Sequence, residues 1–394
     1  MIMLDSKLQR NHFKPKILFL RSFSQVTFAA FIAGGLHYAQ FDFMQYPPLP
    51  ENRLGKLDKL YASTEARNHL QRNVITARKE LKKKIEQGFF DLILLLDYDS
   101  SLFRYTQMSW LKKLRDLAGQ SKFFFRKKWS EIFKELVCMQ GVPFMPSALS
   151  SNRTALAVID LDDWICLHSS GQKLLQACSS YYKRELPYNR FFLYYQQRPA
   201  PWRLWREKLA PICTKVHNIP LGIEDEKYSA LKKLRKNEQD IDIFYCGQST
   251  STIRITALKN LKEFAATTSW NIVIKDDLSF SEYCAAVARS KITLSISGGG
   301  WDCFRHYEAV ALGSVPLMDA PTVDAFWWNQ APTELFFTGT FKDFQLKIDK
   351  LLSNACLRSK CFIQLENLIE SRMLHSKIVK YIVHSSFNKK YVAC

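Results

Sequence analysis

The sequence predicts an α/β protein made of two doubly wound domains that face each other across a cleft. Short apolar runs alternate with helical segments, and these runs occur in two separate series, as parallel α/β domains require. The length of 394 residues suits two domains of roughly 200 residues each. A content of 47% hydrophobic and 24% charged residues is typical of well-packed globular proteins.

The first domain opens with a short apolar run at residues 16–20, a polar break and a small-residue helix at 26–39. Residues 64–86 are polar and carry apolar side chains at helical spacing, so we expect one helix there. Residues 90–97 are almost wholly apolar, which predicts a strand buried on both faces of a parallel sheet. Further helices are expected at 107–117 and 129–140, and a further strand at 155–160.

The second domain repeats the alternation after a segment that is rich in aromatic residues, Arg and Pro. We place the crossover at about residues 211–220 and predict domains over 1–212 and 213–375, followed by a C-terminal helix and tail over 376–394. Strands of the second domain are expected at 242–246, 271–274, 292–297 and 315–318.

The chain is strongly basic, with a formal net charge of +19 and a pI near 9.4. Such a surface attracts polyanions: phosphorylated substrates, anionic lipid headgroups or nucleic acid. The charge is concentrated in three runs, at 78–84, 126–128 and 232–236, each of which also suits a solvated helix face. These runs suit peripheral contact with an anionic membrane, and we see no nucleic-acid-binding motif.

The ten cysteines are scattered and show no paired spacing typical of a zinc site. Scattered thiols in apolar contexts favour a reducing compartment, so we expect a cytoplasmic protein. No segment reaches the roughly 18 apolar residues of a membrane span.

Residues 292–318 read as a strand, a glycine-rich loop, a helix and a second strand. Gly298, Gly299 and Gly300 allow close approach of a ligand to the backbone and can present amides to phosphate. The positive end of the following helix favours the same anion. The loop therefore predicts an anion-binding site.

Three polar residues follow the glycines at a spacing of three. Asp302, Arg305 and Glu308 would share one face of the predicted helix within about 120°. The guanidinium of Arg305 can bind a diphosphate oxygen in bidentate fashion. The carboxylate of Glu308 can accept hydrogen bonds from two adjacent hydroxyls, as on a ribose.

This run resembles the donor-site signature of GT-B glycosyltransferases, enzymes built from two Rossmann-like domains facing across a cleft. The wider run is most similar to their exostosin-like branch, and the signature reads Arg305-x-x-Glu308-Ala309-x-x-x-Gly313-x-x-Pro316. In that family the residue matching Glu308 holds the donor ribose and the residue matching Arg305 faces the phosphates. The resemblance implies transfer of a sugar from a nucleotide-diphosphate donor on the second domain to a glycan or glycolipid acceptor on the first.

One departure concerns stereochemistry. Many retaining GT-B enzymes carry another acidic residue eight positions before the one matching Glu308, and here that position is Gly300. The role of that acid cannot be transferred, so the resemblance leaves the choice between retention and inversion open.

A second element supports the donor site. A strand ends at Gly247, and a small polar loop then leads to a helix carrying Arg254. In GT-B enzymes a similar strand–Gly–loop forms the phosphate wall. Lys275, at the end of another predicted strand, could add a positive charge beside the diphosphate.

The catalytic base stays open among several residues of the first domain. An inverting enzyme needs an acid or base that faces the cleft. Asp97 and Asp99 follow one predicted strand, Asp160 and Asp162 follow another, and His37 lies in the first helix. Carboxylates at strand ends are also frequent helix caps.

We expect a metal-independent enzyme without a cofactor beyond its nucleotide-sugar substrate, because Arg305, amides and a helix end can handle the phosphate charge. The two Asp-x-Asp pairs, Asp97 with Asp99 and Asp160 with Asp162, have the spacing of metal ligands in another glycosyltransferase fold class. Two alternatives remain: a basic nucleic-acid-binding module, and a GT-B relative that is catalytically silent or an epimerase.

Overall fold

The protein folds into two α/β domains, each built on a parallel sheet. The computed structural model describes residues 14–21, 26–46, 63–96, 154–167, 171–197, 210–248 and 251–387. The first domain contains, in chain order, β1 (Ile17–Leu20), α1 (Val26–Tyr38), β2 (Phe43–Tyr46), α3 (Thr64–His69), α4 (Arg78–Glu86), β3 (Leu92–Leu96), β4 (Ala155–Asp160), α9 (Gly171–Ala177), β5 (Ser180–Lys183), the 3-10 helix η3 (Arg190–Gln197), α11 (Ala210–Cys213) and β6 (Val216–Asn218).

The second domain follows a linker that contains α12 (Asp225–Lys232). Its elements are β7 (Ile241–Cys246), α13 (Thr252–Thr267), β8 (Ile272–Lys275), α14 (Phe280–Ala288), β9 (Ser290–Ser295), α15 (Phe304–Ala311), β10 (Val315–Asp319), η5 (Phe326–Trp328), η6 (Thr333–Leu335), β11 (Phe336–Phe337), α16 (Phe344–Ser353), α17 (Ala355–Leu368), the π-helical turn η7 (Ile369–Met373) and α18 (His375–Phe387).

The strand orders are β2-β1-β3-β4-β5-β6 and β11-β10-β9-β7-β8, and the strand pairs are parallel. The predicted fold class is thus confirmed, and the strands expected near residues 16–20, 155–160, 242–246, 271–274, 292–297 and 315–318 are all present. The helices expected at 107–117 and 129–140 lie outside the described residues.

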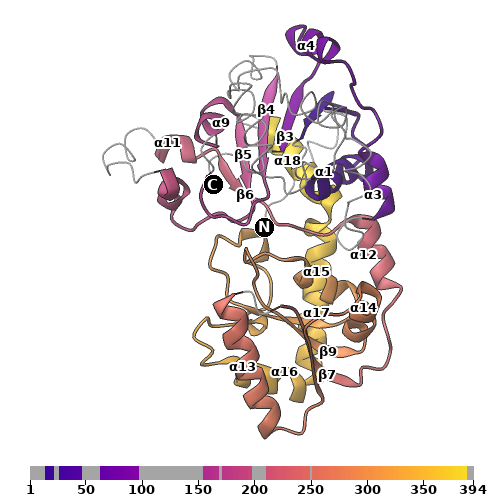
Figure 1. Ribbon diagram of the computed structural model, residues 1–394, viewed down its shortest axis with the longest axis vertical. Helices are drawn as coiled ribbons and strands as arrows, with labels where there is room; N and C mark the ends of the chain where they lie inside the picture. Colours follow the sequence, from indigo (N-terminus) through magenta and orange to yellow (C-terminus); the bar gives the residue numbers. More distant parts are fainter. Residues whose placement is uncertain are drawn as a thin grey trace, which may run out of the picture.

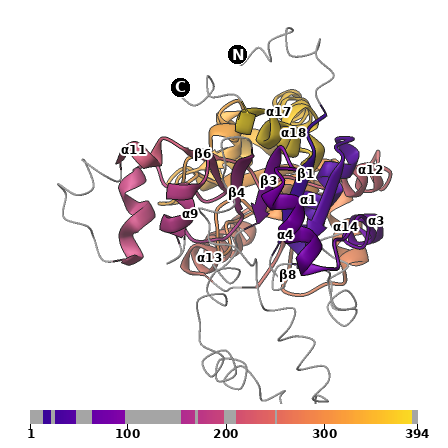
Figure 2. The ribbon, with the colours of Figure 1, turned by 90° about the horizontal axis from the view of Figure 1, so that it is seen from above.

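The first sheet is covered on both faces. Leu94 and Ile159 face a cluster with α1 and α18, whereas Ile93 and Val158 face the opposite cluster with α4 and α9. Seen from above, the strands lie between α11 at one side and α3 at the other (Figure 2). Burial on both faces explains why β3 reads as the uninterrupted apolar run LILLL.

The single helix expected at 64–86 is wrong: the chain forms α3 and α4 with a break between them. In the break, Asn73 adopts a positive φ of 53° and Val74 forms a parallel bridge with Gln45. The buried Gln45 side chain donates to the carbonyls of His69 and Arg72, both at 2.5 Å. A buried glutamine thus binds the last carbonyls of α3, which overrides the local helical pattern.

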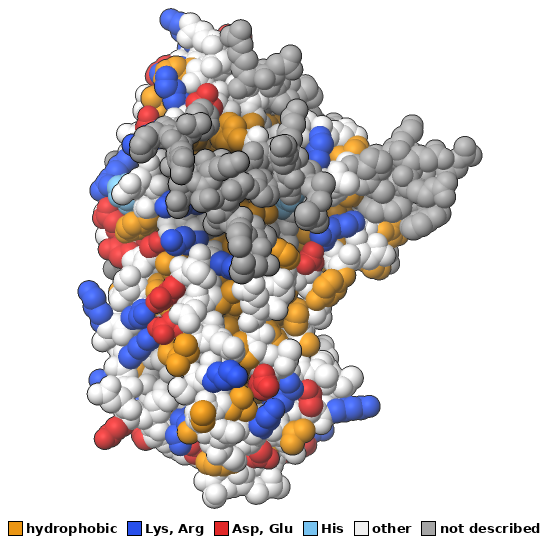
Figure 3. Space-filling model, turned by 180° about the vertical axis from the view of Figure 1, so that it is seen from behind, with side chains coloured by type: hydrophobic (Ala, Val, Ile, Leu, Met, Phe, Trp, Pro, Cys, Tyr) orange, Lys and Arg blue, Asp and Glu red, His pale blue; other side chains and the backbone are white. Residues whose placement is uncertain are grey.

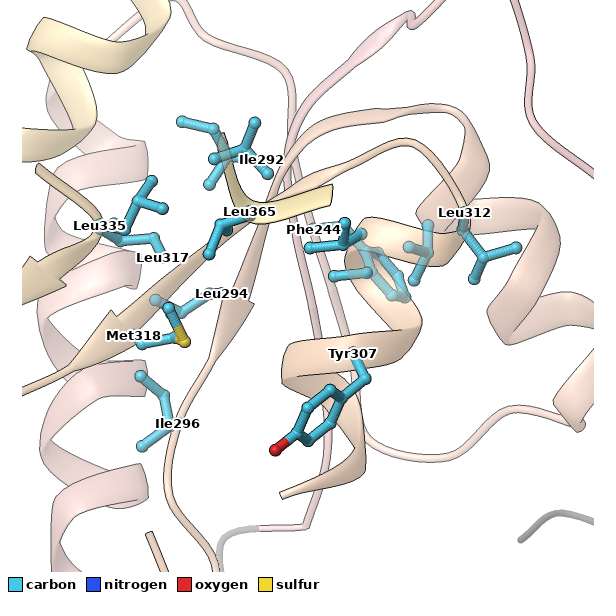
Figure 4. Close-up of a cluster of buried hydrophobic side chains, with 14 of the residues drawn as sticks. Phe244, Ile292, Leu294, Ile296, Tyr307, Leu312, Leu317, Met318, Leu335 and Leu365 are labelled. Atoms are coloured by element: carbon cyan, nitrogen blue, oxygen red, sulfur yellow. The ribbon is translucent and has the colours of Figure 1, made fainter. Parts of the chain in front are cut away.

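The core of the second domain is continuous from sheet to helices. One buried cluster contains Leu294 of β9, Ile296 just after it, Leu317 of β10, Tyr307 of α15 and Leu365 of α17 (Figure 4). This packing fixes α15 against the sheet, and α15 carries the predicted signature residues.

Two segments join the domains. The linker leaves the first sheet after β6, so the predicted boundary at residue 212 lies a few residues too early, although β6 ends within the expected crossover at 211–220. The chain then returns: α18, yellow in Figure 1, rises from the second domain and packs against α1 and β4. Gly222 has a φ of +71°, and a Cβ there would lie 2.6 Å from the carbonyl oxygen of Met373. Only glycine fits this close approach.

Within the described part of the chain, no helix combines the length and apolar character needed to cross a bilayer. The described cysteines are free thiols, and most of them are buried.

Candidate functional site

The signature helix α15 starts at the carboxyl edge of the second sheet. Cys303 is its N-cap, and Gly313 follows its C-cap with a φ of +94°. Arg305 therefore lies in the first turn, and Glu308 lies one turn later, as the spacing predicted. Pro316 sits near the start of β10, where it pairs with Thr293 of β9.

Arg254 and Arg305 converge beside the ends of β7 and β9. Arg254 Nε donates to the carbonyl of Ser297 at 3.0 Å, and Arg305 Nη1 lies 3.5 Å from the carbonyl of Ile296. A Cβ on Gly298 would lie 2.7 Å from Arg254 Nη2, and one on Gly247 would lie 3.4 Å from Arg305 Nη2. The glycines thus leave room for the two guanidinium groups.

The two guanidinium groups repel each other. Burial, followed by the charge of Arg305, lowers the pKa of Arg254. Among the described residues no carboxylate forms an ion pair with Arg305. Two adjacent cations at strand ends form a site suited to a polyanion such as a diphosphate.

Lys275 lies at the same sheet edge, with an exposed side chain. Its carbonyl accepts a hydrogen bond from the amide of Gly247 at 3.2 Å. The main chain of Lys275 therefore supports the loop that carries Gly247, and the predicted contact of its side chain with a phosphate stays a prediction.

Glu308 lies on the hinge side of α15. Its carboxylate accepts a hydrogen bond from Lys227 Nζ at 2.7 Å, and Lys227 also lies 5.0 Å from the ring centre of Phe280. Glu308 borders a small pocket lined by Phe31, Gly222, Ile223, Glu224, Lys227, Phe304 and His375. The carboxylate is thus preorganised by a cation from the linker, which the sequence reading missed.

The predicted helix position of Asp302 is wrong. Asp302 precedes the N-cap of α15, so it does not share the helix face of Arg305 and Glu308. Its buried carboxylate accepts hydrogen bonds from the amide of Leu221 at 2.6 Å and from the hydroxyl of Tyr307 at 2.8 and 2.9 Å. Asp302 therefore fixes the interdomain linker, and its contact with a donor stays a prediction.

His306 anchors the base of the glycine loop. Its Nδ1 lies 2.8 Å from the Ser295 hydroxyl, and its Nε2 lies 3.0 Å from the carbonyl oxygen of Trp301. Burial opposes its charge, but Cys303, Asp302 and Asp319 together outweigh burial and raise the pKa of His306 to about 9. This support holds the loop in place from beneath.

Gly299 and Gly300 face the first domain. Glu185, just after β5, accepts hydrogen bonds from the amides of Trp301 and Asp302, both at 3.1 Å. A Cβ on Gly300 would lie 2.6 Å from Glu185 Cδ, and a Cβ on Gly299 would lie 2.6 Å from Asp163 Oδ2. The amides after the glycines thus bind a carboxylate of the first domain.

Comparison with solved structures addresses the fold. A glycosyltransferase from Rickettsia africae aligns over 97% of this chain and 99% of its own, with a TM-score of 0.50 and 11% identity. The chain has the GT-B fold. An α-glucosyltransferase in complex with UDP and DNA has a TM-score of 0.49 at 10% identity, covering 95% of this chain and 100% of its own. The catalytic domain of starch synthase IV from Arabidopsis thaliana, bound to ADP and acarbose, has a TM-score of 0.47 at 10% identity, covering 95% and 100%.

Sequence comparison is narrower. A family model described as the RXYLT1 C-terminal domain matches residues 248–334, the stretch that holds Arg254, Arg305 and Glu308. No curated protein matches the chain significantly. The sequence match is therefore confined to the second domain of the GT-B fold.

The candidate bases of the first domain differ in their surroundings. Asp160 is fully buried, and its Oδ2 accepts hydrogen bonds from Lys183 Nζ and the Tyr181 hydroxyl, both at 2.9 Å. Asp162 is also buried, and its Oδ1 accepts a bond from the amide of Asp163 at 2.7 Å. These contacts make Asp160 and Asp162 supports of the loop after β4 rather than bases that reach a substrate.

The remaining candidates are His37, Asp97 and Asp99. The exposed His37 stacks on His69 with ring centres 3.9 Å apart, at the end of α1. Asp97 and Asp99 lie outside the described residues. In the part of the chain that is described, no three His, Cys, Asp or Glu side chains are grouped so that they could hold a metal ion.

Three charged residues that the sequence reading did not select do reach the GT-B cleft: Asp163, Arg184 and Glu185. The signal that could have found them is a charged run at a strand end, because Lys183 is the last residue of β5 and Arg184 and Glu185 follow it. Strand carboxyl ends are where ligand sites of parallel sheets lie.

Proposed function

We propose that this protein is a glycosyltransferase that moves a sugar from a nucleotide-diphosphate sugar to a glycan or glycolipid acceptor. The observation that carries the proposal is the convergence of Arg254 and Arg305 beside Gly247 and Gly298, with Glu308 one turn further along α15. The GT-B fold supports it, since several similar structures were solved with UDP or ADP.

The second domain binds the donor in this proposal. Arg254 and Arg305 neutralise the diphosphate and stabilise the charge that develops on it as the glycosidic bond breaks. Glu308, held by Lys227, accepts hydrogen bonds from the ribose hydroxyls. The two guanidinium groups supply the positive charge, so the proposed transfer is metal-independent.

The first domain binds the acceptor, and closure of the cleft excludes water from the reacting sugar. A hexosyltransferase of the exostosin-like branch, working in polysaccharide assembly on the cytoplasmic side of a membrane, is the finer form of this proposal. The match of residues 248–334 to the RXYLT1 C-terminal domain model lies over the run that carries this resemblance.

Peripheral contact with an anionic membrane is part of the proposal. Lys79, Lys82 and Lys83 are exposed on α4, at the end of the first domain away from the second (Figure 1). On the face that Figure 3 shows, the Lys and Arg side chains are spread and mixed with acidic ones, and we place the proposed contact at α4. Co-sedimentation with vesicles should require phosphatidylserine, and equal binding to neutral vesicles would refute the contact.

The donor site is tested by thermal-shift measurements with a panel of nucleoside diphosphates and nucleotide sugars. A ligand at 100 times its dissociation constant stabilises a fold by about 2.7 kcal/mol. We expect one nucleotide to raise the melting temperature of the wild type, and Arg305→Ala and Glu308→Ala to abolish the shift because each removes a charged contact with the ligand.

Arg289→Ala and Glu263→Ala are matched controls, since both are exposed residues of the second domain in surface ion pairs. Both should keep the full shift. If no nucleotide shifts the wild type while single-stranded nucleic acid does, a basic nucleic-acid-binding module replaces the proposal. If nucleotides bind but no sugar is transferred or hydrolysed, a silent relative or an epimerase replaces it.

A further inference from the structure

The first domain presents one accessible carboxylate to the glycine loop. The Asp163 side chain is 52% exposed, whereas the Arg184 side chain with which it forms an ion pair is 3% exposed. Arg184 Nε also lies 3.5 Å from Glu185 Oε1. A buried guanidinium therefore connects the exposed carboxylate of Asp163 to the buried one of Glu185.

Glu185 links this group to the second domain. Its carboxylate accepts hydrogen bonds from the amides of Trp301 and Asp302. Because Gly300 has no side chain, it leaves space for this carboxylate. Burial raises the pKa of Glu185, against the opposing effect of Arg184. Glu185 is 1% exposed, so it can position the loop but cannot touch a substrate in this arrangement.

Asp163 lies close to the arginine pair. Arg254 Nη2 is next to Gly298, Asp163 Oδ2 is next to Gly299, and the two glycines are neighbours. Each side-chain atom lies about 4 Å from the Cα of its glycine, and the two Cα atoms are one residue apart. Arg254 Nη2 and Asp163 Oδ2 therefore lie within about 12 Å of each other. A sugar bound through its phosphate at the arginines fits into this interval.

We propose that Asp163 is the catalytic base of the first domain and that Arg184 and Glu185 are its positioning residues. This inference rests on the proposed glycosyltransferase function. Asp163 takes the proton of the acceptor hydroxyl while that oxygen forms a bond to the anomeric carbon of the donor. The bond from the anomeric carbon to the phosphate oxygen breaks, and the nucleoside diphosphate leaves with the electron pair, its charge balanced by Arg254 and Arg305.

The proposed base and the leaving group lie on opposite sides of the cleft. The arginines that hold the diphosphate belong to the second domain, and Asp163 reaches across from the loop after β4 of the first. Attack from the side opposite the leaving group inverts the anomeric configuration. The inference therefore names inversion as the outcome.

The experiment compares Asp163→Asn with wild type in transfer from the nucleotide sugar that the thermal-shift panel selects. Loss of a general base lowers kcat by roughly 10²- to 10⁴-fold. We expect that loss with unchanged donor affinity, and we expect the acid limb of the wild-type pH–rate profile to disappear. Asp240→Asn is the matched control, because Asp240 is 56% exposed, also pairs with an arginine, and lies at the opposite edge of the second sheet.

Arg184→Gln adds a readout that separates positioning from folding. It should raise the pH at which the acid limb begins, because Asp163 loses its cationic neighbour, and unchanged donor binding would show that the variant is folded. Full activity of Asp163→Asn, or a product with retained configuration, would overturn the inference. In either case donor binding by the wild type keeps the proposed function standing, whereas a wild type without donor binding or transfer refutes that function itself.

Discussion

Two of the regions in which the domains contact each other differ in their chemistry. On the hinge side, Phe31 of α1 packs 5.7 Å from Phe304 and 4.6 Å from His375, between ring centres, and α18 buries apolar residues against α1. On the cleft side, Glu185 and Asp163 contact a loop of glycines. Apolar burial favours a permanent contact, and a charged contact at a loop can be exchanged for a ligand. The apolar contact at the hinge therefore keeps the two domains joined, whereas the charged contact at the cleft can change when a ligand binds.

The largest expected effect is on the pH dependence of the free energy of unfolding, through His375 at the hinge. Burial lowers the pKa of His375 to about 3, so the folded protein keeps this imidazole neutral while the unfolded chain protonates it below about pH 6.5. The unfolded state then binds more protons, and the free energy of unfolding falls by about 1.4 kcal/mol per pH unit from pH 6.5 towards pH 3. His375→Gln should remove this loss.

Urea unfolding at pH 7 and pH 4.5 measures that effect. Between the two pH values, the free energy of unfolding of the variant should fall by about 2.7 kcal/mol less than that of wild type. The reason is that one imidazole no longer titrates over two pH units. His37→Gln, at an exposed position, should follow wild type. Parallel curves for His375→Gln and wild type would mean that His375 is protonated in the folded protein.

A smaller effect on the free energy of unfolding is expected from Gly300→Ala, on the cleft side. Gly300→Ala would place a Cβ 2.6 Å from Glu185 Cδ and displace the carboxylate from the amides of Trp301 and Asp302. Loss of these hydrogen bonds should destabilise the protein by about 1–3 kcal/mol. Gly339→Ala, where a Cβ meets nothing within 4 Å, is the control.

A double-mutant cycle shows whether Glu185 is the cause. If it is, Gly300→Ala should lower the free energy of unfolding much less in a Glu185→Ala background than in wild type. Equal costs in both backgrounds, measured by chemical unfolding, would place the strain elsewhere and remove the cross-domain contact from the account.

The residues of the second domain could be predicted because they are contiguous. Arg305 and Glu308 lie on one helix, and their spacing, the preceding glycines and the later Gly313 and Pro316 are visible in one run of the sequence. Asp302 was wrongly included because the helix begins only at Phe304. Helix boundaries depend on local capping, which spacing alone does not fix.

The first domain could be predicted as a fold but not as a site. The β3 run reads clearly because it is apolar throughout, whereas β5 reads SYYK and β6 has three residues. Asp163, Arg184 and Glu185 meet only because β4 and β5 are neighbours and the second domain closes on their carboxyl ends. The pair of Lys227 and Glu308 spans 81 positions and likewise needs the tertiary structure.

The central claim is that the arginine pair of the second domain binds a diphosphate. It is tested most directly by calorimetric titration of wild type and Arg254→Ala/Arg305→Ala with matched nucleoside diphosphates and monophosphates. The account predicts that wild type binds one diphosphate at least tenfold more tightly than its monophosphate, and that the double variant loses this preference. An equal preference in both proteins would show that the phosphates bind elsewhere and would contradict the assigned donor site.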